Sequence, residues 1–275
     1  MEALTSILLV LERVDTGTKV LEKAIALARC FSARVYLLVE DSNHAGQFAS
    51  LCGERGYDEV AIVSAGRGSL TDAILDLACE RSPDFLVTAR AGAHAGSTGV
   101  FQRNHQQLTT ACPMPLMLMS ERAWHRPVRI AAAVDISRDE AALARAIVQV
   151  SGILSLGCEG DLAVLYSERE QFDASLRIER VVRLARLVRE FHIDGQRIRH
   201  INGAPEETLP VIAASDEYDI LVVGALTHLE GVAAGRATLT RKVVAAFDGD
   251  VVLVNEDVSG SARQSSSSLR HRAAL

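Results

Sequence analysis

Residues 218–256 decide the fold of this chain, and they read YDILVVGALTHLEGVAAGRATLTRKVVAAFDGDVVLVNE. A short apolar run ends at Gly224, a loop rich in small residues and a helix-like segment follow, and a second apolar run occupies residues 251–254. α/β proteins build phosphate pockets from a strand that ends at a glycine and is followed by a loop and a helix. The stretch therefore predicts an α/β fold with a candidate ligand loop after Gly224.

The same pattern occurs once before, at residues 83–121, which read PDFLVTARAGAHAGSTGVFQRNHQQLTTACPMPLMLMSE. Asp84 matches Asp219 at an offset of 135 (219 − 84), and Leu116 matches Val251 at the same offset (251 − 116). The length of 275 residues also suits two domains of ~100–200 residues each. Two copies of one unit are therefore predicted.

The chain is predicted to contain two tandem domains and a tail. Residues 1–122 form the first domain, residues 128–257 form the second, and the Ser-rich residues 258–275 are predicted to be disordered. The join between the domains is short and polar, so we expect the domains to pack against each other as an intramolecular pseudo-dimer. Trp124, the single tryptophan, is expected to anchor this join in a groove between them.

Apolar runs of strand length alternate with segments of helical periodicity in both domains. This alternation predicts βαβ crossovers and, in each domain, a five-stranded parallel sheet with helices on both faces. The predicted strands are residues 7–11, 34–39, 59–63, 84–88, 115–119, 129–134, 161–165, 197–201, 220–223 and 251–254. The predicted helices include residues 20–31, 42–56, 69–81, 139–154 and 172–192, and a further one starts near residue 203.

The predicted helix 172–192 is the main difference between the domains. The first strands are offset by 123 (130 − 7) and later elements by 135, so the second domain carries about 12 extra residues here (135 − 123). Arginines recur at every third position from Arg177 to Arg189, with Glu179 and Glu190 among them. We interpret this face as a solvated surface with i,i+3 and i,i+4 ion pairs. The apolar side is predicted to contain Leu176, Val181, Leu184, Leu187, Val188 and Phe191.

Composition and charge narrow the expected partners. The apolar content of 48% supports two cores, and the formal charge of −6 disfavours nucleic acid, whose phosphates require a basic footprint. No apolar run approaches the ~20 residues of a membrane span, and the start of the chain does not read as a signal peptide. The five cysteines are scattered, which indicates reduced thiols. The sequence therefore predicts a cytoplasmic protein with no nucleic-acid or membrane partner.

Several local patterns coincide in the two halves. The first strand of each half ends at an acidic residue, Glu12 or Asp135, a helix begins at GSLTDAI or GAPEETL, and the last strand follows CPMP or DGD. Over residues 5–256 this order of patterns resembles the universal stress protein family in its tandem form, with two domains on one chain. The first half, with QQLTTACPMPLML leading into its last strand, resembles the E-type tandem proteins of bacteria. The resemblance implies a Rossmann-like five-stranded parallel sheet in each domain.

Members of this family that bind ATP carry an aspartate after the first strand and a Gly-x2-Gly-x9-Gly-(Ser/Thr) loop after the fourth. The aspartate accepts hydrogen bonds from ribose or adenine, and the glycines let backbone N–H groups approach the phosphates. The resemblance implies that the second domain keeps part of such a site, with Thr227 and Ala237 in place of two glycines. The implied cofactor-binding residues are Asp135, Gly224, Thr227, Gly235, Ala237 and Thr238.

The first domain departs further from the family pattern. It keeps one glycine of the three, and it has neither the aspartate nor the hydroxyl. We therefore expect it to have lost phosphate binding. The residues at the corresponding positions are Glu12, Ala89, Gly92, Gln102 and Arg103.

The sequence carries no GxSxG, HExxH or paired-carboxylate motif, and its histidines do not cluster with cysteines at metal-ligand spacing. No catalytic residue and no metal site are predicted. The first hypothesis is a non-enzymatic stress-response or regulatory protein that acts through ligand and protein contacts and pairs into a homodimer through apolar edges. One alternative is a switch or slow ATPase that binds ATP or another adenine nucleotide in the second domain. The other is a protein that holds a small apolar ligand between the domains.

Overall fold

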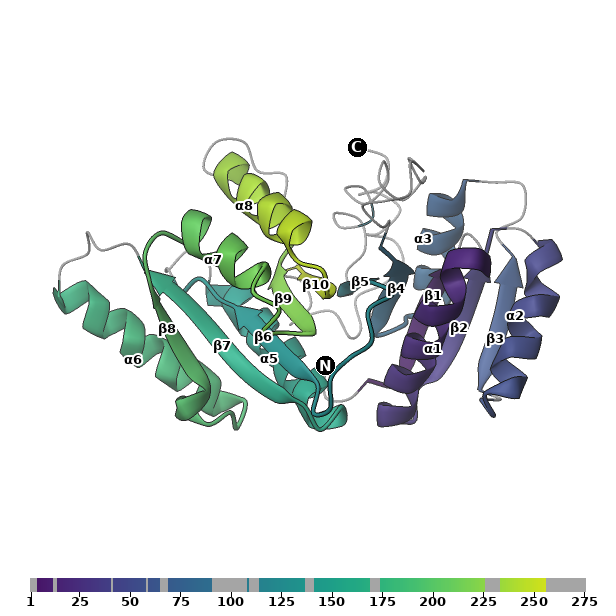
Figure 1. Ribbon diagram of the computed structural model, residues 1–275, viewed down its shortest axis with the longest axis horizontal. Coiled ribbons are helices and arrows are strands. Elements are labelled where there is room, and N and C mark those ends of the chain that lie inside the picture. Colours follow the sequence, from purple (N-terminus) through teal and green to yellow (C-terminus); the bar gives the residue numbers. More distant parts are fainter. Residues whose placement is uncertain are drawn as a thin grey trace. The chain divides into compact units, whose positions relative to one another are not determined.

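The computed structural model divides into two compact units, with the boundary between Ala123 and Trp124 (Figure 1). We call them unit 1 and unit 2 and describe each by itself. The structure describes residues 4–11, 14–40, 42–57, 59–64, 69–90, 108, 114–136, 141–168, 174–225 and 233–255. The predicted tail at 258–275 lies outside these ranges.

Unit 1 is a parallel sheet covered by helices. Its strands lie in the order β3-β2-β1-β4-β5, and each neighbouring pair is parallel. The described elements are β1 (Ser6–Leu11), α1 (Val14–Phe31), β2 (Arg34–Val39), α2 (Ser42–Glu54), β3 (Val60–Ser64), α3 (Leu70–Arg81), β4 (Phe85–Ala89) and β5 (Leu116–Met119).

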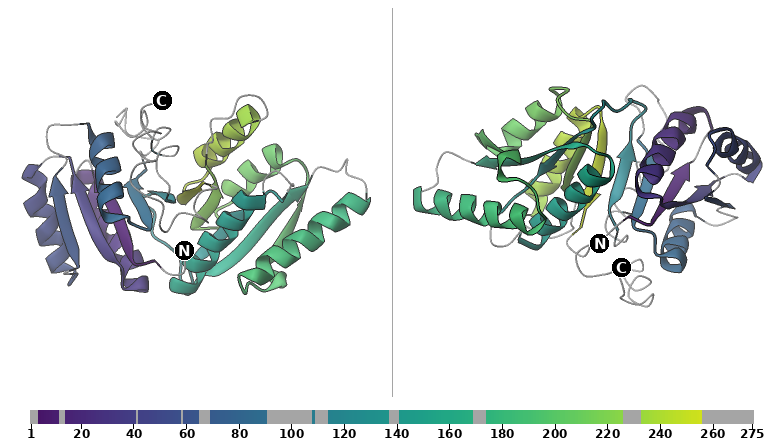
Figure 2. Two further views of the ribbon diagram at one scale, coloured as in Figure 1. Left: turned by 180° about the vertical axis from the view of Figure 1, so that it is seen from behind. Right: turned by 90° about the horizontal axis from the view of Figure 1, so that it is seen from below.

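Unit 2 repeats this arrangement. Its strands lie in the order β10-β9-β6-β7-β8, all parallel. Helices α5 and α6 cover one face of the sheet, and α7 and α8 cover the other (Figure 2). The elements are β6 (Arg129–Ala133), α5 (Ala141–Gly157), β7 (Asp161–Glu168), α6 (Ala174–Glu190), a 3-10 turn (Gly195–Arg197), β8 (Ile198–Asn202), α7 (Pro205–Ala213), β9 (Ile220–Gly224), α8 (Ala233–Ala246) and β10 (Asp250–Val254).

The central strands are buried on both faces. Leu8 and Leu9 are neighbours in β1, so their side chains point to opposite faces of the sheet, and both are fully buried. Strands covered on both faces read as continuous apolar runs, which is why the sequence predicted them well. The predicted α/β class with parallel sheets is confirmed.

Two boundaries differ from the predictions for physical reasons. Helix α1 begins at Val14 rather than at residue 20, because Asp15-Thr16-Gly17 in its first turn interrupts the apolar period. Strand β7 extends to Glu168 rather than residue 165, because its polar last residues pair with β8. The pairing of β7 with β8 cannot be seen in a local sequence window.

An aspartate before β4 and its counterpart before β9 hold the start of the first strand in each unit. Asp84 Oδ2 accepts hydrogen bonds from the backbone N–H groups of Thr5 and Ser6 at 2.7 and 3.0 Å. Asp219 Oδ2 accepts one from the backbone N–H of Arg129 at 2.9 Å. The two aspartates that revealed the repeat therefore have the same structural task in both copies.

The join between the units is anchored at both ends. Lys23 of α1 donates to the backbone carbonyls of Ser120 and Arg122 at 3.0 and 2.8 Å, within unit 1. The indole N–H of Trp124 donates to the buried carboxylate of Asp250 at 2.7 Å, within unit 2. Trp124 thus anchors the join on unit 2.

The prediction for the arginine-rich helix α6 is only partly right. Leu184 and Val188 are buried, but Leu176 is 37% exposed, so the apolar side is shorter than predicted. Arg183 forms the expected i,i+4 pair with Glu179 at 2.7 Å. The structure shows no such pair for Arg186 among the described residues.

Within the described ranges, no helix is both long and apolar enough to span a membrane. The four cysteines that the structure describes, Cys30, Cys52, Cys79 and Cys158, form no disulfide bond.

Candidate functional site

The candidate site of unit 2 lies at the carboxyl edge of its sheet, where β6 and β9 are adjacent. Ala132 of β6 pairs with Val222 of β9. The chain leaves β6 toward β7 on one side and leaves β9 toward β10 on the other. Ligands of open α/β sheets bind at such a switch in strand order, outside the carboxyl ends of the strands. Asp135 follows Ala132 by three positions, and Gly224 follows Val222 by two. The structure therefore brings both residues to the expected edge.

Asp135 stands at this edge with an exposed side chain. The residue before it is fixed, because the backbone N–H of Val134 donates to the carbonyl of Leu165 at 3.0 Å. The residue after it, Ile136, is buried, and its carbonyl accepts a hydrogen bond from Arg183 Nη1 at 2.9 Å. The backbone on both sides of the carboxylate is therefore held in place.

Arg183 was not predicted as part of the site. It belongs to α6, and its guanidinium reaches the backbone beside Asp135 while it also pairs with Glu179. The sequence showed only its place in a series of arginines, and the contact with Ile136 spans 47 positions. Only the packing of α6 on the sheet could reveal it.

Gly224 ends β9 and leaves room for helix α5. A Cβ built on it would lie 2.7 Å from Cδ2 of Leu143, which is too close for a normal contact. Its carbonyl accepts a hydrogen bond from the Thr240 hydroxyl at 3.3 Å, and the next N–H, of Ala225, donates to Val254 at 2.8 Å. The glycine is therefore explained by close packing between helix and strand, in addition to any role toward a ligand.

The remaining predicted residues can be placed only in part. Thr227 lies outside the described residues. Gly235, Ala237 and Thr238 lie in α8, and their side-chain surroundings are also outside what the structure describes. The bond from Thr240 to Gly224 ties α8, which carries these three residues, to the end of β9.

A second polar group missed by the sequence reasoning lies at the carboxyl end of β7, the strand next to β6. The Ser167 hydroxyl donates to the carbonyl of Gly203 at 2.7 Å and lies 2.8 Å from the hydroxyl of Thr208 in α7. Gly203 has φ +119°, and a Cβ there would meet Thr208 at 2.9 Å, so a glycine is required. These hydroxyls fix the start of α7 beside the candidate site. The available sequence signal was a serine close to the carboxyl end of a strand.

The corresponding edge of unit 1 is described only at Ala89. This residue ends β4, and the next N–H, of Arg90, donates to Met119 at 2.7 Å. Glu12, Gly92, Gln102 and Arg103 lie outside the described residues.

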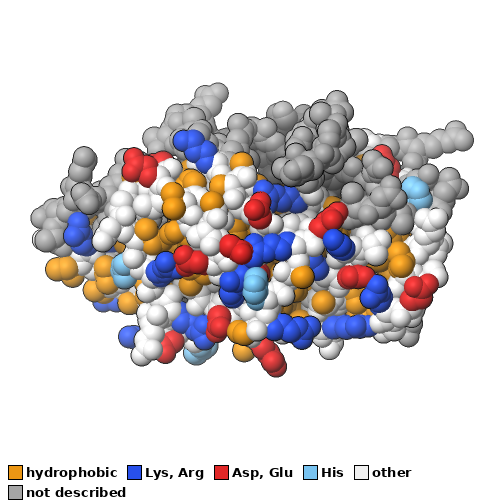
Figure 3. All heavy atoms as spheres, in the orientation of Figure 1, with side chains coloured by type: hydrophobic (Ala, Val, Ile, Leu, Met, Phe, Trp, Pro, Cys, Tyr) orange, Lys and Arg blue, Asp and Glu red, His pale blue; other side chains and the backbone are white. Residues whose placement is uncertain are grey.

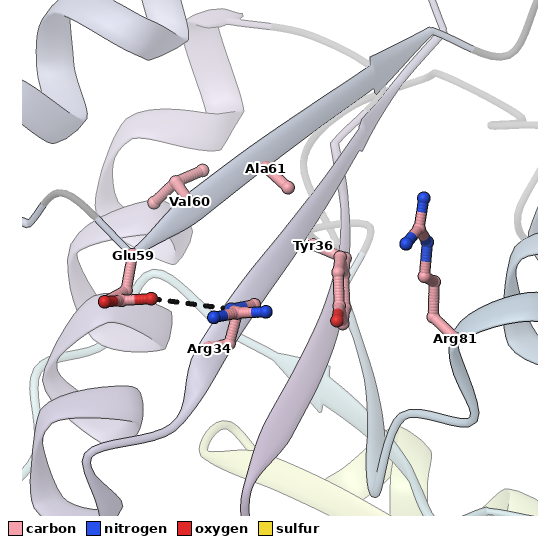
Figure 4. A pocket seen from close by; sticks show the side chains of 6 residues that line it. All are labelled: Arg34, Tyr36, Glu59, Val60, Ala61 and Arg81. Carbon is pink, nitrogen blue, oxygen red and sulfur yellow. Dashed lines mark hydrogen bonds and ion pairs between the residues drawn. The ribbon is translucent and has the colours of Figure 1, made fainter.

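A shallow hollow of about 270 Å³ lies elsewhere on unit 1, at the amino ends of β2 and β3 (Figure 4). Arg34 and Glu59 lie 3.4 Å apart in it, and the Arg81 guanidinium stands 5.7 Å from the ring of Tyr36. Hydrogen bonds to Tyr36 and Glu59 raise the pKa of Arg34. The hollow lies at the strand ends opposite those that bind ligands in α/β sheets, and two of its charged groups, Arg34 and Glu59, already pair with each other. We therefore do not assign the candidate site to it.

The chemistry available at the unit 2 edge is that of a binding site. Asp135 offers carboxylate oxygens that can accept hydrogen bonds from ligand hydroxyl or amino groups. In the part of the chain that the structure describes, no group of three or more His, Cys, Asp or Glu side chains could hold a metal ion.

Comparisons with known proteins support the fold. No family model and no curated protein matches the sequence. A crystal structure from Pseudomonas aeruginosa UCBPP-PA14, assigned to the universal stress proteins, matches with a TM-score of 0.76 and 17% identity, over 100% of this chain and 98% of that one. A universal stress protein from Archaeoglobus fulgidus matches with a TM-score of 0.59 and 11% identity, over 91% and 96% of the two chains.

The chain has the universal stress protein fold. The resemblance seen in the sequence is thereby confirmed at the level of the fold. The same fold occurs in the cytoplasmic domain of a prokaryotic cation chloride cotransporter, with a TM-score of 0.60 and 12% identity, over 92% and 96% of the two chains. Because one fold serves such different proteins, the activity has to be argued from the site.

Proposed function

We propose that this protein is a non-enzymatic stress-response protein whose unit 2 binds an adenine nucleotide at the switch between β6 and β9. Binding there would alter its contacts with other proteins. A slow ATPase that uses the same residues is the alternative for this site.

One observation carries the proposal. Asp135 presents an exposed carboxylate at the carboxyl edge next to the end of β9, and the backbone on both of its sides is fixed by Val134 and Ile136. A carboxylate in this position can accept hydrogen bonds from the two hydroxyls of a ribose. A preorganised acceptor loses little entropy when it binds.

The phosphate side of the proposed site is weaker than in the family pattern. Thr227 and Ala237 replace glycines, and each adds a Cβ where backbone N–H groups would approach the phosphates. Lys242 is exposed on α8 and supplies positive charge near this part of the unit. We therefore expect the affinity to depend more on the ribose and adenine than on the number of phosphates.

Equilibrium dialysis with ATP, ADP and AMP tests the proposal. We expect binding of all three with similar affinity and no turnover of ATP. Asp135→Asn should weaken binding by about tenfold to a hundredfold, the loss expected when hydrogen bonds to a charged acceptor are removed. Asp161→Asn is the matched control, since Asp161 is 65% exposed but lies at the amino end of β7.

Absence of binding at millimolar nucleotide would remove the nucleotide part of the proposal. Binding that is unchanged by Asp135→Asn would move the site elsewhere. Native mass spectrometry of the purified protein provides an independent check, because it also detects the small apolar ligand that was the third hypothesis.

A further inference from the structure

Helix α6 carries a second apolar stripe on its outward surface. Its inner side packs through Leu184 and Val188, which are buried. Away from this buried side, Ile178 is 65% exposed and Val182 is 43% exposed. Hydrophobic side chains gather at the surface where α6 lies, at the lower left of the view (Figure 3). Three of the five large exposed apolar residues of the described chain, Leu176, Ile178 and Val182, belong to this one helix.

Charged residues lie along this apolar stripe and beside it. At about 100° per residue, Ile178, Val182 and Arg189 lie within about 40° of one another around the helix. Glu179 and Arg186 lie about 20° apart on one flank of this stripe, with opposite charges. Arg186 and Arg189 are exposed, and no side-chain partner for either is found in the described ranges.

These positions are self-complementary when two copies of α6 lie antiparallel. A two-fold axis at Val182 places Val182 against Val182 of the partner subunit and Ile178 against the smaller Ala185 of the partner subunit. The same flank of both helices then meets, as it does in antiparallel coiled coils. Glu179 therefore faces Arg186 of the partner subunit, and the symmetry repeats this ion pair.

The charge pattern favours a second copy over a different partner. The apolar stripe is short, and the flank beside Val182 carries both an acidic residue, Glu179, and a basic one, Arg186. This flank therefore complements its own symmetry mate rather than a uniformly acidic surface. Glu179 is 46% exposed in its pair with Arg183, so it remains accessible to another guanidinium. One pair of 17-residue helices offers less than the ~1,200–2,000 Å² of stable interfaces, so the association should be reversible.

We propose that this protein forms a reversible homodimer through an antiparallel pair of α6 helices, with Val182 on the two-fold axis and Glu179 paired with Arg186 of the partner subunit. The 12 residues by which unit 2 exceeds unit 1 (135 − 123) lie in the segment that contains this helix, which has 17 residues against 13 in α2, the helix at the corresponding place in unit 1. The proposal is independent of nucleotide binding at Asp135.

Sedimentation velocity of the full chain over a wide concentration range tests the proposal. We expect a monomer–dimer equilibrium for the unmodified protein. Glu179→Arg and Arg186→Glu should each place like charges opposite each other twice and raise the dissociation constant about tenfold. The double variant Glu179→Arg/Arg186→Glu should restore dimerisation, although the pair between Glu179 and Arg183 stays broken.

Two further variants test the apolar centre. Val182→Asp should abolish the dimer, whereas Val211→Asp, at an apolar residue of α7 that is 68% exposed, should leave it unchanged. Far-ultraviolet circular dichroism checks that each variant is folded. A monomer at every concentration, a dimer that is insensitive to Val182→Asp, or a double variant without rescue would each overturn the proposal.

Discussion

Arg129 holds the buried carboxylate of Asp219 through three hydrogen bonds. Its backbone N–H and its Nε donate to Oδ2 at 2.9 and 3.3 Å, and its Nη2 donates to Oδ1 at 3.1 Å. His125 Nδ1 lies 2.7 Å from the same Oδ1, and the carboxylate is only 1% exposed. Residues 90 positions apart are thus joined where β6 and β9 begin, and the buried charge is compensated.

The first prediction concerns Asp219→Asn. Burial alone would raise the pKa of Asp219, but the hydrogen bonds from Arg129 and His125 outweigh it, and the pKa is lowered. An amide cannot accept all of these bonds, so we expect a loss of ~1–3 kcal/mol in the free energy of unfolding at neutral pH. Urea unfolding followed by the fluorescence of Trp124, the only tryptophan, measures it in unit 2.

The same variant has a defined pH dependence. Because the pKa of Asp219 is lower in the folded state, its contribution is present above the unfolded value of ~3.9 and is lost as the pH falls through the folded value. The stability difference between the two proteins should therefore narrow below about pH 4. Glu217→Gln, in the exposed pair with Arg199, is the control and should cost less than ~1 kcal/mol. A difference that widens on acidification would contradict this account.

The second prediction compares the two copies of this aspartate. Asp84 is half-buried and accepts hydrogen bonds from Thr5 and Ser6, and within the described residues no guanidinium pairs with it. We expect Asp84→Ala to cost ~1–3 kcal/mol, and Asp219→Ala to cost ~3–5 kcal/mol because it leaves the Arg129 charge unpaired. Thermal unfolding of both variants by calorimetry measures which one loses more stability. Equal losses of stability would show that leaving the Arg129 charge unpaired has no additional cost.

The third prediction concerns Gly224→Ala. The new methyl group would meet Leu143 at 2.7 Å, so we expect a loss of ~1–3 kcal/mol from overpacking. The double variant Gly224→Ala/Leu143→Ala should lose less than the sum of the single losses, because the two residues share the same space. A double-mutant cycle by urea unfolding measures the coupling. Additive losses would mean that the glycine is needed for a reason other than Leu143.

The fourth prediction ranks the effects of glycine-to-alanine substitutions on stability by the atoms that lie close to each glycine. A Cβ on Gly249 would lie 2.5 Å from the backbone carbonyl oxygen of Asp219, and that carbonyl accepts the N–H of Asp250 and cannot easily move. Gly249→Ala should therefore cost more than Gly224→Ala. Gly46 in α2 has nothing within 4 Å, so Gly46→Ala should raise stability by ~0.5–1 kcal/mol. Chemical denaturation of both variants tests this ranking, and a stabilised Gly249→Ala would contradict it.

The sequence predicted the strands far better than the site. Buried runs such as residues 220–223 and 251–254 identified β9 and β10 to within one residue, because strands covered on both faces are continuously apolar. The exposed stripe of α6 was not predicted, because helical periodicity shows that Ile178 and Leu184 lie on different sides without showing which side is covered. Of the predicted site residues, Asp135 and Gly224 are brought to one edge, and the others lie outside what the structure describes in full.

The sequence by itself determined the α/β class and the repeat, because hydrophobic periodicity and the offset between Asp84 and Asp219 are local patterns that survive in the chain. The tertiary structure alone decided what these residues do. Asp219 is a buried partner of Arg129, and Gly224 makes room for Leu143. These roles depend on contacts between residues far apart in the chain, which exist only once the helices pack on the sheet.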